Sequence, residues 1–168
     1  GLEMYDRIGW LRWLWGDVPG ALEMQALAVG AGSPLDPEPF AWVLTRMGWL
    51  HAISGQAAPE IDAALALLPD YPAARFARGR IRLGAGDLKG ATDDLKVAGP
   101  TVEATRARAE LANVAEPGVD VGDIGVDKVG AQDPRGYAIW LADSPESANH
   151  AKAVALLRRA GIGGPYGL

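Results

Sequence analysis

The residues of this chain that could act as a general base or a metal ligand include two histidines, His51 and His150. Catalytic and zinc-binding histidines usually come with partners at a fixed spacing, such as the H-E-x-x-H pattern of metalloproteases or a cysteine nucleophile. The chain has no cysteine, and neither histidine belongs to an H-E-x-x-H pattern. We therefore expect both histidines to be structural side chains.

Three aspartates, Asp120, Asp123 and Asp127, could together hold a cation. A calcium loop of the EF-hand type needs alternating oxygen ligands, a central glycine and a distal glutamate. Their spacing of three and four residues instead places the three carboxylates on one face of a helix. A solvated helix face explains them without a metal, so we predict no metal site.

Motifs that bind phosphate or activate a hydroxyl nucleophile do not occur in the sequence. The glycines form no G-x-x-x-x-G-K-[ST] loop, and no G-x-G-x-x-G lies between a strand pattern and a helix pattern. No serine has the G-x-S-x-G setting of a nucleophile elbow; the serines are Ser33, Ser54, Ser144 and Ser147. The sequence therefore predicts no catalytic residue, no cofactor and no enzyme activity.

The most unusual stretch is "IGWLRWLWGD" (8–17), which places Trp10, Trp13 and Trp15 within six positions. Tryptophans gathered in this way could line a cofactor site, form a wall for a peptide, or be the packing face of a buried helix. The stretch occurs again in altered form further along the chain. That recurrence determines which helices must position the tryptophans.

Three segments align without gaps: "IGWLRWLWGD" (8–17), "MGWLHAISGQ" (47–56) and "RGRIRLGAGD" (78–87). Each has a glycine at its second position and another seven residues later; these are Gly9, Gly48 and Gly79, followed by Gly16, Gly55 and Gly86. The first set is spaced by 39 and 31 residues, a period typical of two-helix repeats. The repeated unit therefore predicts helix pairs.

Each repeated residue has an expected structural role. The second glycine of each segment can end a helix in a left-handed conformation, and the Asp or Gln after it can cap the next helix. A glycine inside a helix costs up to about 1 kcal/mol relative to alanine. Close approach of a partner helix, opposite Ala21 or Ala91, would compensate for this cost. We expect antiparallel helix hairpins that bury a continuous core when they stack.

This pattern resembles the tetratricopeptide repeat family, whose signature combines a large residue, a Leu-Gly pair and a small residue in the second helix. The matching residues are Tyr5, Ile8, Gly9, Ala21, Leu44, Met47, Gly48, Gly79 and Ala91. The resemblance implies an all-α fold, a right-handed α-solenoid of about five antiparallel hairpins, the last two degenerate. The expected repeats are 3–34, 37–71, 72–100, 101–130 and 133–160 within one domain, 1–160, with a flexible tail at 161–168. Residues 118–130 could form a strand or a helix, and the repeat order favours a helix.

Departures from the family pattern have local explanations. The long first interval contains a loop that ends with Asp36 as a helix N-cap and Pro37 at the first helical position. The short second interval predicts a second helix in 58–72 that has lost about one turn. Arg78 and Arg82 occupy positions that are usually apolar in the family. Either this helix is rotated, or the arginine stems pack while their charged ends reach solvent.

The repeat also divides the tryptophans into two groups. Ile8, Leu11 and Trp15 share one helix face and are expected to form its packing stripe. The family resemblance implies a concave groove lined by the first helix of each hairpin. Asp6 would face this groove, and its predicted binding residues are Trp10, Trp13, Trp42, Thr45, Trp49, Phe76 and Arg80. Such an aromatic groove suits an apolar or proline-bearing peptide. Packing against a neighbouring repeat is the open alternative for Trp10 and Trp13, whereas Trp140 is expected in the core.

Composition limits the possible partners. The 168 residues are 49% hydrophobic and 22% charged, which is ordinary for a folded domain. A net charge of −5 argues against nucleic acid and anionic membranes, which attract basic surfaces. No run approaches the roughly 20 apolar residues of a membrane span, so direct membrane insertion is not expected.

These observations together predict a non-enzymatic protein–protein interaction module or scaffold that binds a peptide or helix in its groove. The alternative is a structural repeat segment without a separate ligand, which packs against further repeats or self-associates through its exposed ends. The chain begins at Gly1 in the middle of the pattern, so we expect a fragment of a longer bacterial protein. Cytoplasmic localisation is the default expectation, and the absence of a targeting signal carries no weight in a fragment.

Overall fold

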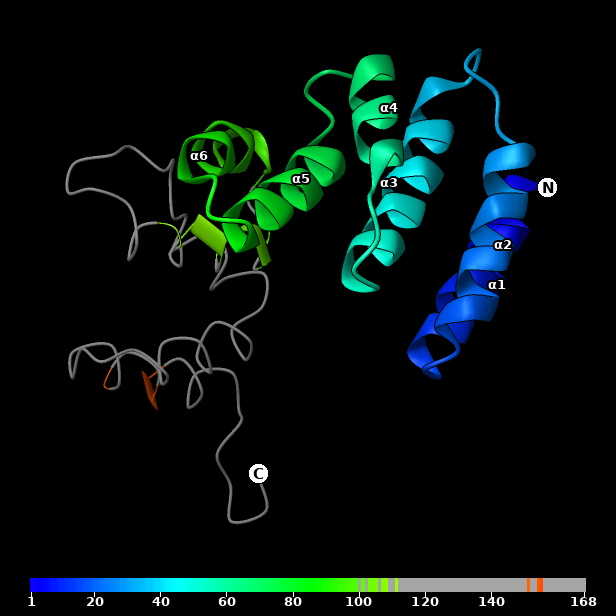
Figure 1. Cartoon of the computed structure of the whole chain (residues 1–168), viewed down its shortest axis with the longest axis horizontal. Helices are drawn as coiled ribbons and strands as arrows, with labels where there is room; N and C mark the ends of the chain where they lie inside the picture. Colours follow the sequence, from blue (N-terminus) through cyan, green and yellow to red (C-terminus); the bar gives the residue numbers. More distant parts are fainter. Residues whose placement is uncertain are drawn as a thin grey trace. The chain divides into compact units, whose positions relative to one another are not determined.

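The computed structural model of this chain describes residues 1–99, together with 101, 103–105, 107–108, 111, 151 and 154–155 (Figure 1). The chain divides into two compact units, Gly1–Ala98 and Gly99–Leu168. The expectations for the helix at 118–130, the tail at 161–168 and most of the repeats at 101–130 and 133–160 lie outside the described residues. So do those for His150, Trp140 and the three aspartates near residue 123.

The first unit is built of α-helices that pack in pairs: α1 with α2, α3 with α4, and α5 with α6 (Figure 1). The helices are α1 (Leu2–Leu14), α2 (Val18–Gly30), α3 (Pro37–Ile53), α4 (Pro59–Leu67), α5 (Pro72–Gly84) and α6 (Leu88–Val97). No strand occurs among the described residues. The predicted all-α class and the pairing of helices are confirmed.

The mid-helix glycines lie where the two helices of each pair approach one another. Gly9 is inside α1, Gly48 inside α3 and Gly79 inside α5, and all three are buried. A Cβ atom on Gly9 would lie 3.2 Å from the carbonyl oxygen of Ala21, and one on Gly79 would lie 2.8 Å from the side chain of Leu95. Close helix approach therefore explains these glycines. Gly9 meets Ala21 as predicted, whereas the atoms nearest a Cβ on Gly79 belong to Leu95 and Asp94 and not to Ala91.

The second glycine of each segment ends its helix in the predicted left-handed conformation. Gly16, Gly55 and Gly86 have φ angles of 83°, 74° and 81°, a region that side chains with a Cβ rarely adopt. Asp17 accepts a hydrogen bond from the Gly20 amide at 2.9 Å and so caps α2, and Asp87 caps α6 through the Gly90 amide at the same distance. In the second pair the N-cap is Ala58 and makes no side-chain bond, so Gln56 does not cap α4.

Other local predictions are also confirmed. Asp36 is the N-cap of α3 and Pro37 its first residue, although the Asp36 side chain makes no capping bond. α4 has 9 residues where α2 has 13, which is the shortened second helix expected from the 31-residue interval. Separately from these predictions, the Thr101 hydroxyl of the second unit accepts a hydrogen bond from the Ala104 amide at 3.1 Å.

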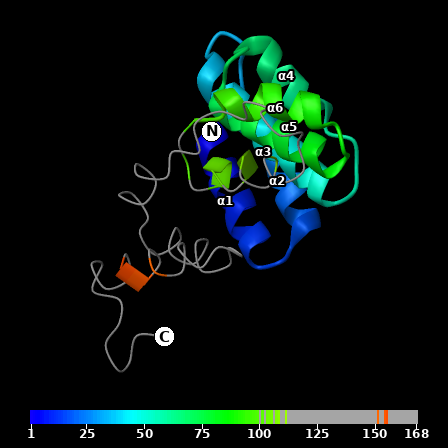
Figure 2. The same ribbon diagram turned by 90° about the vertical axis from the view of Figure 1, so that its left-hand side faces the viewer.

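Successive pairs lie next to one another within the first unit. α3 packs against α2, and α5 packs against α3 and α4. Figure 2 looks along this succession, so the helices overlap in that view. A core cluster joins the second pair to α5 and consists of Ala41, Leu44, Ile61, Ala64, Leu65, Ala74 and Ala77. Small residues dominate it, so helix backbones can approach closely. None of the described helices is long and apolar enough to span a membrane.

The expectation that Ile8, Leu11 and Trp15 form the packing stripe of α1 is wrong. All three side chains are exposed, whereas the buried residues of this helix are Asp6 and Gly9. The contact face of α1 is set by the glycine that allows α2 to approach. The apolar residues at helical spacing therefore lie on a different face.

Candidate functional site

The aromatic residues of α1 and α3 form a stack around one arginine. The guanidinium of Arg46 lies 4.5 Å from the ring centroid of Trp10 and 4.6 Å from that of Trp42. On α1, the rings of Trp10 and Trp13 have centroids 4.5 Å apart and are tilted by 34°. We call Trp10, Trp13, Trp42 and Arg46 the aromatic stack. Cation–π contacts of this kind stabilise by roughly 0.5 to 2 kcal/mol each.

The buried carboxylate of Asp6 holds two members of the aromatic stack, Trp42 and Arg46, in place. Asp6 is buried and accepts hydrogen bonds from the indole Nε1 of Trp42 at 3.3 Å and from Nε2 of Gln25 at 3.0 Å. The guanidinium of Arg46 lies 3.4 Å from the same carboxylate. Burial lowers the pKa of Arg46 from its ordinary value, while the charge of Asp6 opposes that shift. The charge of Arg46 is thus largely balanced within the site.

The geometry gives α1 and α3 a rigid, partly exposed aromatic surface. Trp10 and Trp42 keep 39% and 37% of their surface exposed, although the contacts with Arg46 and Asp6 hold their rings in place. Rings that are already fixed lose little conformational entropy when a ligand covers them. This surface is suited to contact with an apolar segment.

The remaining residues predicted for the groove have different surroundings. The hydroxyl of Thr45 is buried and donates a hydrogen bond to the carbonyl of Ala41 in its own helix, at 2.7 Å. Trp49 packs against the core cluster, and its ring centroid is 6.4 Å from that of Phe76. Arg80 lies on α5 and is half-buried. The structure therefore brings Trp10, Trp13 and Trp42 together, with Trp49 and Phe76 forming a second aromatic contact.

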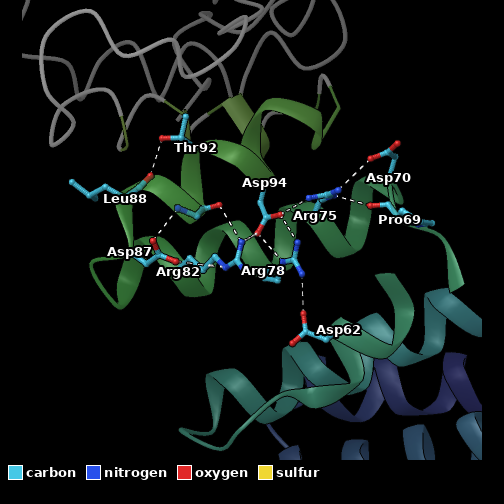
Figure 3. Close-up of polar contacts among 11 residues, drawn as sticks. Asp62, Pro69, Asp70, Arg75, Arg78, Arg82, Asp87, Leu88, Thr92 and Asp94 are labelled. Atoms are coloured by element: carbon cyan, nitrogen blue, oxygen red, sulfur yellow. Dashed lines mark hydrogen bonds and ion pairs between the residues drawn. The ribbon is translucent and has the colours of Figure 1, made fainter. Parts of the chain in front are cut away.

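A second polar cluster lies between α5 and α6 and is centred on Asp94 (Figure 3). This carboxylate is fully buried and accepts hydrogen bonds from three arginines of α5. Arg78 binds both carboxylate oxygens, through Nε and Nη2, at 2.8 Å each. Arg75 and Arg82 each donate one bond at 2.9 Å. We call these four residues the Asp94 cluster.

The Asp94 cluster also joins neighbouring helix pairs. Nη1 of Arg78 donates a 2.9 Å hydrogen bond to Asp62 of α4, as Figure 3 shows. Arg75 additionally contacts Asp70 at 3.2 Å. The cluster explains the arginines at apolar repeat positions: α5 is not rotated, because Gly79 still faces α6, and their charged ends bind a buried carboxylate. We assign it a structural role.

The charge state of Asp94 follows from this arrangement. Burial by itself would raise the pKa of the carboxyl group, but hydrogen bonds from Arg78 and Arg75 and the charges of Arg78 and Arg82 outweigh it. The pKa of Asp94 is therefore lowered from its ordinary value. The same hydrogen bonds raise the pKa of Arg78, so both partners are ionised at neutral pH.

The lowered pKa predicts how stability depends on pH. In acid, the unfolded chain takes up a proton at Asp94 near its ordinary pKa of about 3.9, before the folded chain does. The stability that Asp94 provides should be complete above about pH 5 and should decline as the pH falls through the folded-state pKa. Urea unfolding of the native chain and of Asp94→Asn at several pH values measures this: the difference between them should shrink in acid. A difference that grows on acidification would contradict the assignment.

Sequence reasoning missed the Asp94 cluster. It also missed Arg46 of the aromatic stack and Gln25, which both contact Asp6. A signal for the first was present: Arg75, Arg78 and Arg82 share one face of a helix, and Asp94 lies beside Leu95 on the buried face of the next. For the second there was no such signal. Arg46 and Gln25 meet Asp6 only through tertiary packing, across 40 and 19 residues.

His51 is half-buried, and its Nδ1 lies 3.1 Å from the Glu60 carboxylate in the neighbouring helix. The two groups form no hydrogen bond. In the described part of the chain, no three His, Cys, Asp or Glu residues are grouped so that they could hold a metal ion. His51 thus contacts one carboxylate and lies outside any metal-binding arrangement in that part.

Comparison of the chain with protein-family models, with curated proteins and with solved structures found no match. The function must therefore be inferred from the geometry and chemistry of the first unit.

Proposed function

We propose that this chain is a non-enzymatic interaction module that binds a peptide segment of another protein on the aromatic stack. We further propose that its helix pairs form a right-handed α-solenoid of the tetratricopeptide kind. The glycine register supports this, because three successive pairs repeat the same buried mid-helix glycine and the same left-handed turn. Each such unit buries itself mainly against its neighbours.

The observation that carries the proposal is the fixed but exposed state of Trp10 and Trp42. Arg46 lies between their rings, and the indole N–H of Trp42 is bonded to Asp6. An arrangement needed only for packing would bury these rings, since each removes a large apolar area from water. Preorganised tryptophan is also typical of the residues that contribute most to protein interfaces.

The chemistry of the surface favours an apolar or proline-bearing segment. Indole rings provide wide contact areas for aliphatic and pyrrolidine groups. Asp6 balances the charge of Arg46, so the surface does not select strongly for a charged ligand. A short segment of a partner that presents two or three apolar side chains in sequence fits this description.

A displayed library of random twelve-residue peptides tests the proposal, with the full chain as the bait. We expect enrichment of peptides rich in apolar residues and proline. Trp42→Ala should weaken binding of the enriched peptides at least tenfold in calorimetric titration, because it removes one ring and one side of the stack around Arg46. Its helical content by circular dichroism should stay unchanged.

Trp15→Ala is the matched control, since this indole is more exposed than Trp42 and does not belong to the aromatic stack. It should leave peptide affinity unchanged. Equal enrichment on the native chain and on the double variant Trp10→Ala, Trp42→Ala would show that the surface does not bind peptides.

A further inference from the structure

Met4, Ile8 and Leu11 of α1, together with Trp15 directly after the last residue of the helix, form an apolar and exposed face; we call these four residues the α1 stripe. Their exposed fractions are 52%, 36%, 50% and 84%. The spacings of four, three and four residues place them on one face of the helix. Apart from Trp10 and Leu14 on α1, the other large exposed apolar residues described are dispersed, with no more than two on any other helix. A patch of this kind on a helix marks a contact site.

Two positions of the α1 stripe, those of Met4 and Leu11, are interface positions elsewhere in the first unit. Counted from the mid-helix glycine, Met4 and Leu11 correspond to Val43 and Leu50 in α3, both buried. In α5 the corresponding residues are Ala74, which belongs to the core cluster with α3 and α4, and Ile81, which packs against it. Met4 and Leu11 of the α1 stripe therefore lie at positions where α3 and α5 pack against other helices. In α1, these side chains stay exposed among the described residues.

The order of residues in the α1 stripe is self-complementary. Reversal of the helix direction about the midpoint of the α1 stripe, between Gly9 and Trp10, places Ile8 opposite the partner's Leu11, and Met4 opposite the partner's Trp15. The spacing is that of a and d positions in a heptad, and antiparallel helices pair a with d. A methionine beside an indole is also a favourable contact. A second copy of the chain thus carries the residues that match the α1 stripe, and no different partner protein is needed.

Residues beside the α1 stripe are compatible with such pairing. Arg12 on one edge lies 3.6 Å from the Asp17 carboxylate and 3.7 Å from that of Glu23, so its charge is already balanced within the chain. On the other edge, the antiparallel register places Arg7 near the partner's Leu14, over which its aliphatic stem can pack. The register therefore directs no pair of unbalanced like charges at one another.

We infer that this chain forms a symmetric dimer through antiparallel packing of α1 against α1 of a second copy. A twofold arrangement uses one surface twice and is the commonest form of self-association. The helix is about 20 Å long, so the interface is small, and we expect a reversible dimer with a micromolar dissociation constant. The aromatic stack lies on another face of α1, so the dimer and the peptide site are independent.

Sedimentation velocity of the full chain over a range of concentrations tests the dimer. The native chain should change from monomer to dimer, and Leu11→Asp should weaken dimerisation at least tenfold, because each dimer contains the substitution twice. The matched control is Leu27→Asp in α2, where the leucine is 45% exposed and lies outside the α1 stripe. It should leave the dissociation constant unchanged. A native chain that stays monomeric, or equal effects of both variants, would overturn the inference.

Cysteine cross-linking tests the register, and the chain has no native cysteine to interfere. A mixture of Met4→Cys and Trp15→Cys chains should form an oxidised heterodimer faster than either variant forms a homodimer. Faster oxidation of Met4→Cys alone would show a parallel arrangement and overturn the proposed one. Equal rates in all three samples would show that the α1 stripe faces another occupant.

Discussion

Replacement of Asp94 by asparagine is expected to lower the free energy of unfolding of the first unit by about 3 kcal/mol at neutral pH. Asparagine keeps the size of the side chain but removes the negative charge that three arginines share. The guanidinium groups then lie together beside a neutral amide, and their remaining carboxylate partners, Asp70, Asp62 and Asp87, are largely exposed. The arginine side chains remain 21–34% exposed, which places the effect at the lower end of the range for broken buried ion pairs.

The matched control is Asp93→Asn, the same substitution one residue earlier in α6. Asp93 is exposed, and surface charges of this kind contribute little to stability. Urea unfolding followed by circular dichroism should show a change within about 0.5 kcal/mol for this variant. Similar losses for Asp93→Asn and Asp94→Asn would show that the Asp94 cluster has no special role in holding α5 and α6 together.

Gly48→Ala has the second largest expected effect, a loss of about 2 kcal/mol in the free energy of unfolding. The added Cβ would lie 2.6 Å from Cγ1 of Ile61 and 3.1 Å from the Ile61 backbone nitrogen. Because a backbone atom cannot rotate away, α3 and α4 must separate. Alanine favours a helix by up to about 1 kcal/mol over glycine. The expected loss in the free energy of unfolding already includes this gain.

Gly84→Ala shows whether the effect of Gly48→Ala comes from helix contact. Gly84 ends α5, and a Cβ there meets no atom within 4 Å. Alanine at this position should therefore leave stability unchanged or raise it by a few tenths of a kcal/mol. Thermal unfolding of both variants gives the comparison. A Gly48→Ala chain as stable as the native one would contradict the close helix packing.

The helices of the first unit could be predicted because their signals are local. Gly16, Gly55 and Gly86 end helices by their own conformational freedom, and Asp17 and Asp87 cap helices through amides three residues away. Repetition then made the pairing of helices predictable, since a glycine within a helix requires a close neighbour.

The surroundings of each helix face could not be predicted from periodicity. Periodicity shows that Ile8, Leu11 and Trp15 share a face, but it does not show which element covers that face. In the structure their exposed fractions are 36%, 50% and 84%. Similarly, the aromatic residues of the candidate site were identified, whereas Arg46 was missed. In the sequence, Arg46 is indistinguishable from an ordinary surface charge, because its contact with Trp10 depends on the packing of α1 against α3.

The indole N–H signals of the tryptophans in a nitrogen–proton correlation spectrum give the most direct test of the peptide-binding proposal. An enriched peptide from the displayed library, titrated into the full chain, should shift the signals of Trp10, Trp13 and Trp42. The signal of Trp15, which lies on the α1 stripe, should stay in place. Shifts confined to Trp15, or no shift at Trp10 and Trp42 at saturating peptide, would contradict the assignment of the aromatic stack as the binding surface.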